Sequence, residues 1–208
     1  MACLLAVPAD GGAQTTGSVA GTVTVQRAPV RRSADRYPGA ATHVKTVQDV
    51  PVVVFIEGPV AGAPARPLST IPVMAQSDTA FSPAALAVPV GTTVSFPNQD
   101  TFFHNVFSYS ASARFDLGRY PRGQAKEVTF EKPGIVKVYC EVHEFMRAII
   151  VVTENPFHAV VDQTGSFRID GVPPGRYRFV VWHPDLDPVE RDVEVAAGRT
   201  ARLDAELR

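Results

Sequence analysis

Short segments in which apolar and polar residues alternate recur along this chain, and turns rich in Gly and Pro separate them. Alternation with a period of two is typical of β-strands that have one buried face. The 15 Gly and 18 Pro among 208 residues suit many tight turns. No segment carries a helical period, although residues 82–86 could form one helical turn. We therefore expect an all-β protein built from antiparallel sandwiches or barrels. The predicted strands are 17–25, 51–56, 71–76, 85–88, 92–96, 125–130, 135–139, 147–152, 166–170, 176–182, 192–195 and 202–207.

Composition excludes several classes of protein. Apolar residues make up 45% of the chain, which is enough for a core without help from disulfides, and Cys3 and Cys140 cannot form a disulfide framework. Twenty basic and 21 acidic residues give a net charge of -1, so no electrostatic field favours nucleic acid. No apolar run approaches the roughly 18 residues that a membrane span requires. We therefore predict neither a nucleic-acid partner nor a membrane span.

The domain organisation follows from a shortage of strands at the end of the chain. About four strands are predicted in the last fifty residues, which is few for independent stability. The strands in 17–25 and 51–56 are available to complete that sandwich. We expect residues 17–58 and 155–208 to form one discontinuous β-sandwich, residues 59–69 a linker and residues 70–154 an inserted domain. Residues 1–16 are expected to be a residual signal-like or disordered N-terminus.

The outer sandwich resembles a known module. Residues 17–23 and 52–58 resemble the opening of carboxypeptidase-regulatory-like (transthyretin-like) sandwiches, and residues 162–177, with a Gly-x-Phe and a Pro-Pro-Gly-x-Tyr element, resemble its second half. Such modules are usually structural or adhesive, so the resemblance implies no catalytic residue here.

The chemistry of the chain is concentrated between residues 139 and 146. Cys140, His143 and Met146 follow a Cys-x-x-His-x-x-Met spacing in one loop between two predicted strands. His104 follows another strand far upstream, and a sandwich can bring these strand ends together at one pole. One thiolate, two imidazoles and a weak thioether are the ligands of a blue copper site. Each residue alone would more often be an ordinary core or loop residue, but the combination favours copper.

These residues resemble the cupredoxin family, and the resemblance covers residues 71–153. The short loop is more similar to amicyanin than to plastocyanin, and the implied fold is a Greek-key sandwich. The resemblance assigns one type 1 copper ion to His104, Cys140, His143 and Met146, and it makes Asn105 a residue that ties the two ligand loops together. Val142 and Glu144 stand where amicyanin has Pro. Phe102, Phe103 and Phe145 are either core residues or an apolar rim around His143, whereas His43, His158 and His183 are interpreted as surface or structural residues.

The resemblance predicts a single-electron carrier and not an enzyme. Multicopper oxidases and copper nitrite reductases place His beside the loop Cys, whereas Tyr139 and Glu141 flank Cys140 here. The alternative is a copper storage or delivery protein without a shuttling role, although three Met in the chain argue against a Met-rich chaperone site. Its expected partners are redox proteins such as a dehydrogenase or a c-type cytochrome, and we expect a monomer.

The expected location is the periplasm or the extracellular space. Blue copper carriers usually work there, and residues 1–9 look like the end of a truncated signal peptide, without the basic start. A frayed cytosolic terminus is the alternative interpretation of these residues.

Overall fold

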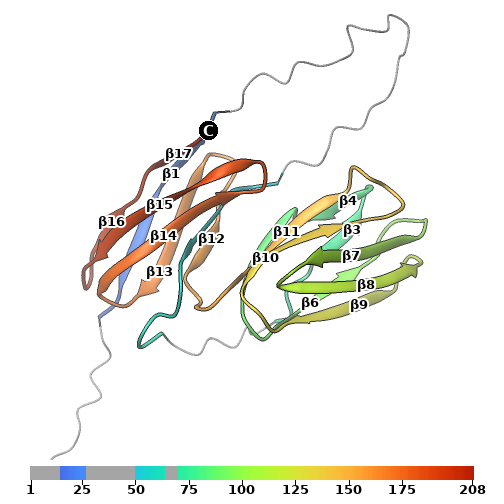
Figure 1. The fold of residues 1–208 in the computed structure, drawn as a ribbon, viewed down its shortest axis with the longest axis horizontal. Helices are drawn as coiled ribbons and strands as arrows, with labels where there is room; N and C mark the ends of the chain where they lie inside the picture. The colour runs from blue at the N-terminus through green and yellow to red at the C-terminus, as the bar shows by residue number, and fades with distance from the viewer. Residues whose placement is uncertain (1–14, 27–49, 64–69) are drawn as a thin grey trace, which may run out of the picture.

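The computed structural model describes residues 15–26, 50–63 and 70–208, and the described part of the chain contains strands and no helix. The strands form two β-sandwiches that lie side by side (Figure 1). We call strands β3–β11 the central sandwich, and strands β1, β2 and β12–β17 the terminal sandwich. The all-β prediction is confirmed.

The central sandwich carries the predicted ligands. Its larger sheet has the order β5-β11-β10-β7-β8, in which β5 and β11 are parallel and the other pairs antiparallel. The facing layer consists of the pairs β3-β4 and β6-β9, which two isolated bridges, Val73 to Ser95 and Gln76 to Asn98, connect. The strands are β3 (Ala75–Ser77), β4 (Ala80–Ser82), β5 (Ala85–Pro89), β6 (Thr92–Pro97), β7 (His104–Ser110), β8 (Ala113–Tyr120), β9 (Ala125–Phe130), β10 (Gly134–Tyr139) and β11 (Arg147–Thr153).

The terminal sandwich combines strands from both ends of the described chain. In one sheet β1 pairs with β13 antiparallel and with β16 and β17 parallel, and the other sheet has the order β12-β2-β14-β15. The pairings of β1 and β2 with later strands join segments about a hundred residues or more apart. The strands are β1 (Gly17–Val25), β2 (Val53–Ile56), β12 (His158–Val160), β13 (Ser166–Val172), β14 (Gly175–His183), β15 (Leu186–Val195), β16 (Thr200–Arg202) and β17 (Ala205–Leu207).

Each sandwich has its own core, and a third apolar cluster lies between them. Val54 and Ile56 on one face of β2 pack in the terminal core with Phe179, whereas Val53 on the other face packs against Ile149 and neighbouring residues of the central sandwich. Burial of both faces explains why the sequence from 51 to 56 is continuously apolar instead of alternating. The two sandwiches therefore share a buried contact.

Several local predictions were wrong or incomplete. Residues 82–86 form no helical turn, because β4 ends at Ser82 and β5 begins at Ala85. Strands β4, β7, β8 and β12 were not predicted, and residues 156–208 hold six strands where about four were expected. The end of the chain is also not a simple meander, because β16 and β17 both pair with β1 and so bring the C-terminal residues back to the opening strand.

Some predictions fall on residues that lie outside the described part of the chain: the signal-like segment 1–9, His43, and residues 64–69 of the linker. Among the described residues, no helix is long and apolar enough to cross a membrane.

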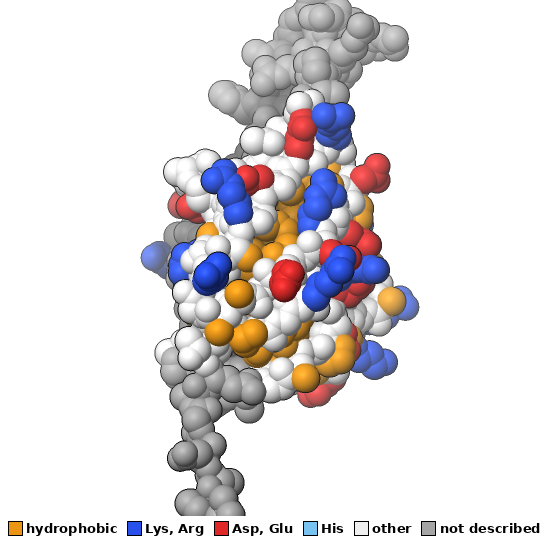
Figure 2. Space-filling model, turned by 90° about the vertical axis from the view of Figure 1, so that its left-hand side faces the viewer, with side chains coloured by type: hydrophobic (Ala, Val, Ile, Leu, Met, Phe, Trp, Pro, Cys, Tyr) orange, Lys and Arg blue, Asp and Glu red, His pale blue; other side chains and the backbone are white. Residues whose placement is uncertain are grey.

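On the face of the terminal sandwich seen in Figure 2, basic and acidic side chains are interleaved around small apolar areas. Arginines of this sandwich pair with acids, as in Arg176 with Asp192 and Arg202 with Asp204.

Candidate metal centre

The four predicted ligands lie at the ends of adjacent strands. His104 is the first residue of β7, Cys140 directly follows β10, and Met146 directly precedes β11. Because β10 lies between β7 and β11 in the sheet, these strand ends meet at one edge of the central sandwich. The sheet order thus brings residues 36 positions apart to one place. His104 follows β6 (Thr92–Pro97), as predicted from the sequence, and it also begins β7, which was not predicted.

The structure brings His104, Cys140 and His143 together. One ligand atom from each of the three lies within 4.8 Å of the other two, and Cys140 Sγ lies 3.6 Å from His104 Nδ1. His104 is fully buried, Cys140 is 3% exposed and His143 is half-buried. Within residues 15–26, 50–63 and 70–208, these three residues form the one group of three or more His, Cys, Asp or Glu side chains that could hold a metal ion.

The donor atoms fit a metal ion. Nitrogen and sulfur ligands lie about 2.0 to 2.3 Å from a metal ion such as zinc. Two ligands of one ion can therefore be as far apart as Cys140 Sγ and His104 Nδ1, which are separated by 3.6 Å. Two imidazoles and a thiolate, which are soft and borderline donors, suit copper. The three residues could therefore hold a copper ion with little rearrangement.

Met146 and Asn105 support this cluster from either side. Met146 is fully buried and belongs to the same apolar cluster as Cys140, and its backbone N–H donates to the carbonyl of His143 at 2.9 Å. This turn holds the backbone of Met146 next to that of His143. Asn105 is 2% exposed, and its Oδ1 accepts a hydrogen bond from the backbone N–H of Glu141 at 2.6 Å. The Asn105 side chain therefore joins the start of β7 to the loop that carries Cys140.

Aromatic side chains surround the half-buried His143. Its ring centroid lies 5.4 Å from that of Phe102 and 5.6 Å from that of Phe145. Phe102, Phe103 and Val142 are 41%, 55% and 41% exposed, whereas Phe145 packs partly against the core. Of the two interpretations of these residues, exposure favours a rim for Phe102 and Phe103, and Phe145 contributes to both rim and core.

A carboxylate that was not predicted from the sequence also lies at this site. Asp100 Oδ2 lies 2.7 Å from His104 Nε2, on the opposite side of the ring from Cys140. Partial burial raises the pKa of Asp100, but hydrogen bonds from Thr79 N, from His104 and from Asp78 N outweigh it and hold that pKa below its ordinary value. Asp100 lies in a loop with no periodic pattern, and its spacing of four residues from His104 was the one available signal.

The other histidines lie apart from this cluster. His158 is half-buried at the junction of the two sandwiches, where its Nδ1 lies 3.2 Å from Thr153 Oγ1. His183 is 3% exposed, and its Nδ1 accepts a hydrogen bond from Asp185 N. These contacts favour a structural role for His158 and His183, which were interpreted from the sequence as surface or structural residues.

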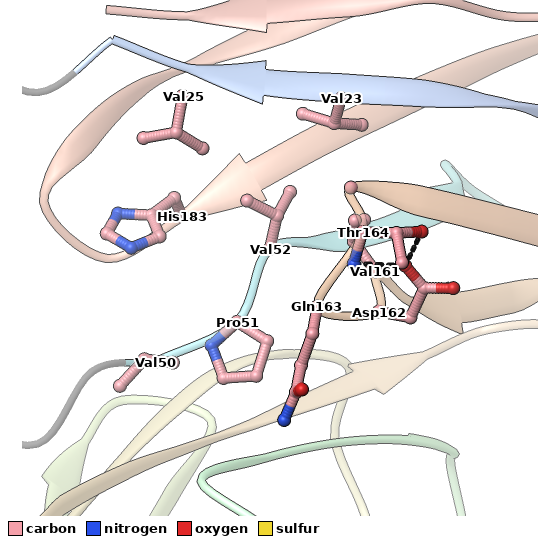
Figure 3. Close-up of a pocket in the computed structure, with 11 residues that line it drawn as sticks. Val23, Val25, Val50, Pro51, Val52, Val161, Asp162, Gln163, Thr164 and His183 are labelled. Carbon is pink, nitrogen blue, oxygen red and sulfur yellow. Dashed lines mark hydrogen bonds between the residues drawn. The ribbon is translucent and has the colours of Figure 1, made fainter.

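A cavity of about 850 Å³ lies in the terminal sandwich, away from the ligand cluster (Figure 3). Val23, Val25 and Val52 line it together with His183. Its acidic residue, Asp162, accepts hydrogen bonds within its own turn, including one from Thr164 N. The walls of this cavity therefore combine apolar and polar groups, and its acidic group is held by local structure.

Two family models match the chain. Residues 71–153 match copper binding proteins of the plastocyanin/azurin family, and residues 146–208 match the carboxypeptidase regulatory-like domain. The second match begins before β11, which pairs within the central sandwich, and it does not include β1 and β2, which pair with its strands. No curated protein matches the chain.

Solved structures of copper proteins resemble part of the chain. A reduced tryptophan-to-tyrosine variant of amicyanin is 27% identical with a TM-score of 0.38, covering 49% of this chain and 97% of amicyanin. A copper-containing nitrite reductase from Thermus scotoductus is 31% identical with a TM-score of 0.39, covering 47% of this chain and 25% of the reductase.

The central sandwich is thus the part of the chain that is similar to copper binding proteins of the plastocyanin/azurin family, and it carries the candidate ligands. The two matched models name the same two families that the sequence was found to resemble.

Proposed function

We propose that this protein is a single-electron carrier with one type 1 copper ion, bound by His104, Cys140, His143 and Met146. The observation that carries the proposal is the convergence of two imidazoles and one thiolate within 4.8 Å at the edge of the plastocyanin/azurin-type domain. The fully buried Met146 supplies the weak fourth donor. A copper ion bound there would alternate between Cu(II) and Cu(I), so that one electron is gained or lost at a time.

The residues around the site support reversible electron transfer because they keep the ligands in place. His104 and Met146 are fully buried; His104 begins β7, and Met146 directly precedes β11. The Asn105 hydrogen bond connects the two ligand segments, so that movement of one requires movement of the other. Ligands held by a sheet change position little between oxidation states, and a small reorganisation favours fast electron transfer. Closed packing also argues against delivery of the ion to another protein.

His143 is the proposed point where electrons enter and leave. Among the three clustered ligands it is the half-buried one, and Phe102, Phe103 and Val142 expose apolar surface beside it. An apolar surface allows a partner to approach closely and excludes water from the contact. The nearby charged pair Arg119–Glu141 is neutral as a whole, so it adds no strong preference for one sign of partner.

We further propose that the partners are redox proteins such as a dehydrogenase or a c-type cytochrome, and that the protein acts in the periplasm or outside the cell as a monomer. Catalytic turnover is not part of this proposal. Tyr139 and Glu141 flank Cys140, whereas multicopper oxidases and copper nitrite reductases have a His beside the loop Cys.

The visible absorption spectrum tests the proposal. After addition of Cu(II), we expect an intense blue band that ascorbate bleaches and air or ferricyanide restores, with copper retained throughout. Cys140→Ser should lack this band, whereas Cys3→Ser, which removes the other cysteine, should keep it. A colourless protein that retains copper would instead support the storage alternative, and copper release on reduction would support delivery.

A further inference from the structure

Asp100 contacts the buried face of a proposed copper ligand. The residue lies between β6 and β7, and its Oδ2 is 2.7 Å from Nε2 of His104. The His104 side chain is fully buried and that of Asp100 is 11% exposed. Water therefore screens this contact weakly, and a charge on Asp100 acts on the imidazole more strongly than a surface carboxylate would.

The carboxylate is held by the backbone of a separate hairpin. Oδ1 accepts a hydrogen bond from Asp78 N at 2.7 Å, and Oδ2 accepts one from Thr79 N at 2.9 Å. Asp78 and Thr79 connect β3 to β4 with φ angles of 53° and 57°, in the left-handed region that residues other than Gly seldom adopt. The turn thereby aims two N–H groups at one carboxylate, which fixes the group in both position and charge.

The other side of this loop is fixed as well. Asp100 N donates to Asn98 Oδ1 at 2.9 Å, and the Asn98 amide donates to the carbonyls of Phe102 and Tyr120. Asn98 is 1% exposed. The β6–β7 loop is thus tied to β8 directly before it reaches His104, so Asp100 cannot turn away without breaking several hydrogen bonds.

This contact determines which nitrogen of His104 is free to bind a metal. An ionised carboxylate only accepts hydrogen bonds, so Nε2 must carry the proton. In the neutral ring Nδ1 then has a lone pair, and Nδ1 is the atom 3.6 Å from Cys140 Sγ. A carboxylate on the far nitrogen also makes the ligating nitrogen more basic.

We propose that Asp100 is a positioning residue that fixes the Nε2–H tautomer of His104 and stabilises Cu(II) relative to Cu(I) at this site, which lowers the reduction potential. The added negative charge favours the ion with the higher positive charge. The effect on the potential rests on the proposed copper function, whereas the tautomer of His104 belongs to the protein itself.

The tautomer is tested first, in the copper-free wild-type protein. Nitrogen chemical shifts of His104, measured by ¹⁵N NMR at about pH 9 where a free imidazole is neutral, should show protonated Nε2 and unprotonated Nδ1. His143, the second imidazole of the cluster, provides an internal reference in the same spectrum. A His104 ring protonated on Nδ1, or an equal mixture of the two forms, would overturn the proposal.

The potential is tested with Asp100→Asn, which keeps the shape of the side chain and removes its charge. We expect the ratio of the Cu(II) to the Cu(I) dissociation constant to rise about tenfold, equal to a potential about 59 mV higher for a one-electron couple. Asp116→Asn is the matched control, because Asp116 lies exposed on β8, accepts a hydrogen bond from Gly118 N and carries the same charge. It should leave the potential nearly unchanged.

The possible outcomes separate this inference from the proposed function. An unchanged potential in Asp100→Asn, or an equal rise in Asp116→Asn, would refute a specific role for Asp100. A wild-type protein that binds no copper would refute the proposed function, while the ¹⁵N measurement would still decide the tautomer. If Asp100→Asn fails to fold, Asp100→Glu, which retains the charge, takes its place. This variant should bind copper with a potential close to that of the wild type. A tenfold or larger rise in the ratio of the Cu(II) to the Cu(I) dissociation constant would count against the proposal.

Discussion

Ile56 offers a direct test of whether the two ends of the described chain form one folding unit. We infer that residues 17–58 and 155–208 do so, because β2 pairs with β12 and β14 and packs in the terminal core. Ile56 is 1% exposed in that core, and β2 lies about a hundred residues before the strands it contacts. Ile56→Ala should therefore destabilise the terminal sandwich, although the substitution lies outside the matched regulatory-like segment.

The expected magnitude follows from burial. Truncation of a fully buried Ile to Ala costs about 2 to 5 kcal/mol, because transfer free energy is lost and a cavity remains. With a urea dependence of about 2 kcal/mol per molar, the unfolding midpoint should fall by about 1 to 2 M. Val160→Ala, at a 37% exposed position on β12 of the same sandwich, should change the free energy of unfolding by less than about 0.5 kcal/mol.

Trp182 makes the measurement specific. It is the only tryptophan of the chain, and it lies on β14 of the terminal sandwich, at the contact with the central one. Its fluorescence therefore follows unfolding of the terminal sandwich, while the visible band of bound copper follows the central sandwich. An Ile56→Ala variant whose tryptophan transition stays within about 0.3 M of the wild-type midpoint would refute the reasoning.

Fragments test the same inference from the other direction. Residues 70–153 alone contain all the strands of the central sandwich and all four proposed ligands, so this fragment should fold and bind copper. Residues 155–208 alone lack β1 and β2, and should show no cooperative unfolding transition. A cooperatively folded 155–208 fragment would contradict the discontinuous domain.

Three further predictions concern single residues. Met146→Leu should keep copper but raise the reduction potential, since the buried side chain retains its volume and loses the thioether; an unchanged voltammetric midpoint would place the axial ligand elsewhere. Gly21→Ala should lower the thermal midpoint, because a Cβ there would lie 1.8 Å from Leu203 O, and a raised midpoint would contradict this packing. The hydrogen bond from Arg202 holds the pKa of Asp204 below its ordinary value, so the stabilisation is complete above about pH 4 and is lost as the pH falls through the lower folded-state value. Asp204→Asn should thus reduce the difference between urea midpoints at about pH 7 and pH 3, and an undiminished difference would exclude Asp204 as a source.

Local sequence was sufficient where the backbone pattern is regular. The strand predicted at 125–130 is β9, with the same bounds, because polar and apolar residues alternate from Glu127 to Phe130. The same holds for β1, predicted at 17–25. In such segments the side-chain period alone determines which face is buried, and no distant residue is needed to recognise it.

Strand β7 could not be predicted in this way. Its buried positions include His104, Asn105 and Ser108, which are polar and read from the sequence as a loop. They are tolerated inside because distant groups satisfy them, as the Glu141 backbone does for Asn105. A functional site breaks the local pattern because its polar residues need partners that only the fold supplies.

The sequence by itself determined the all-β class, the Cys-x-x-His-x-x-Met loop and the donor chemistry, since each depends on residues close together in the chain. The tertiary structure decided how far-separated segments meet: His104 with Cys140, β1 with β16 and β17, and Asp100 with both His104 and the β3–β4 turn. These contacts depend on the order of strands within the sheets. That order is set by burying both cores at once, a global condition that no local window of sequence contains.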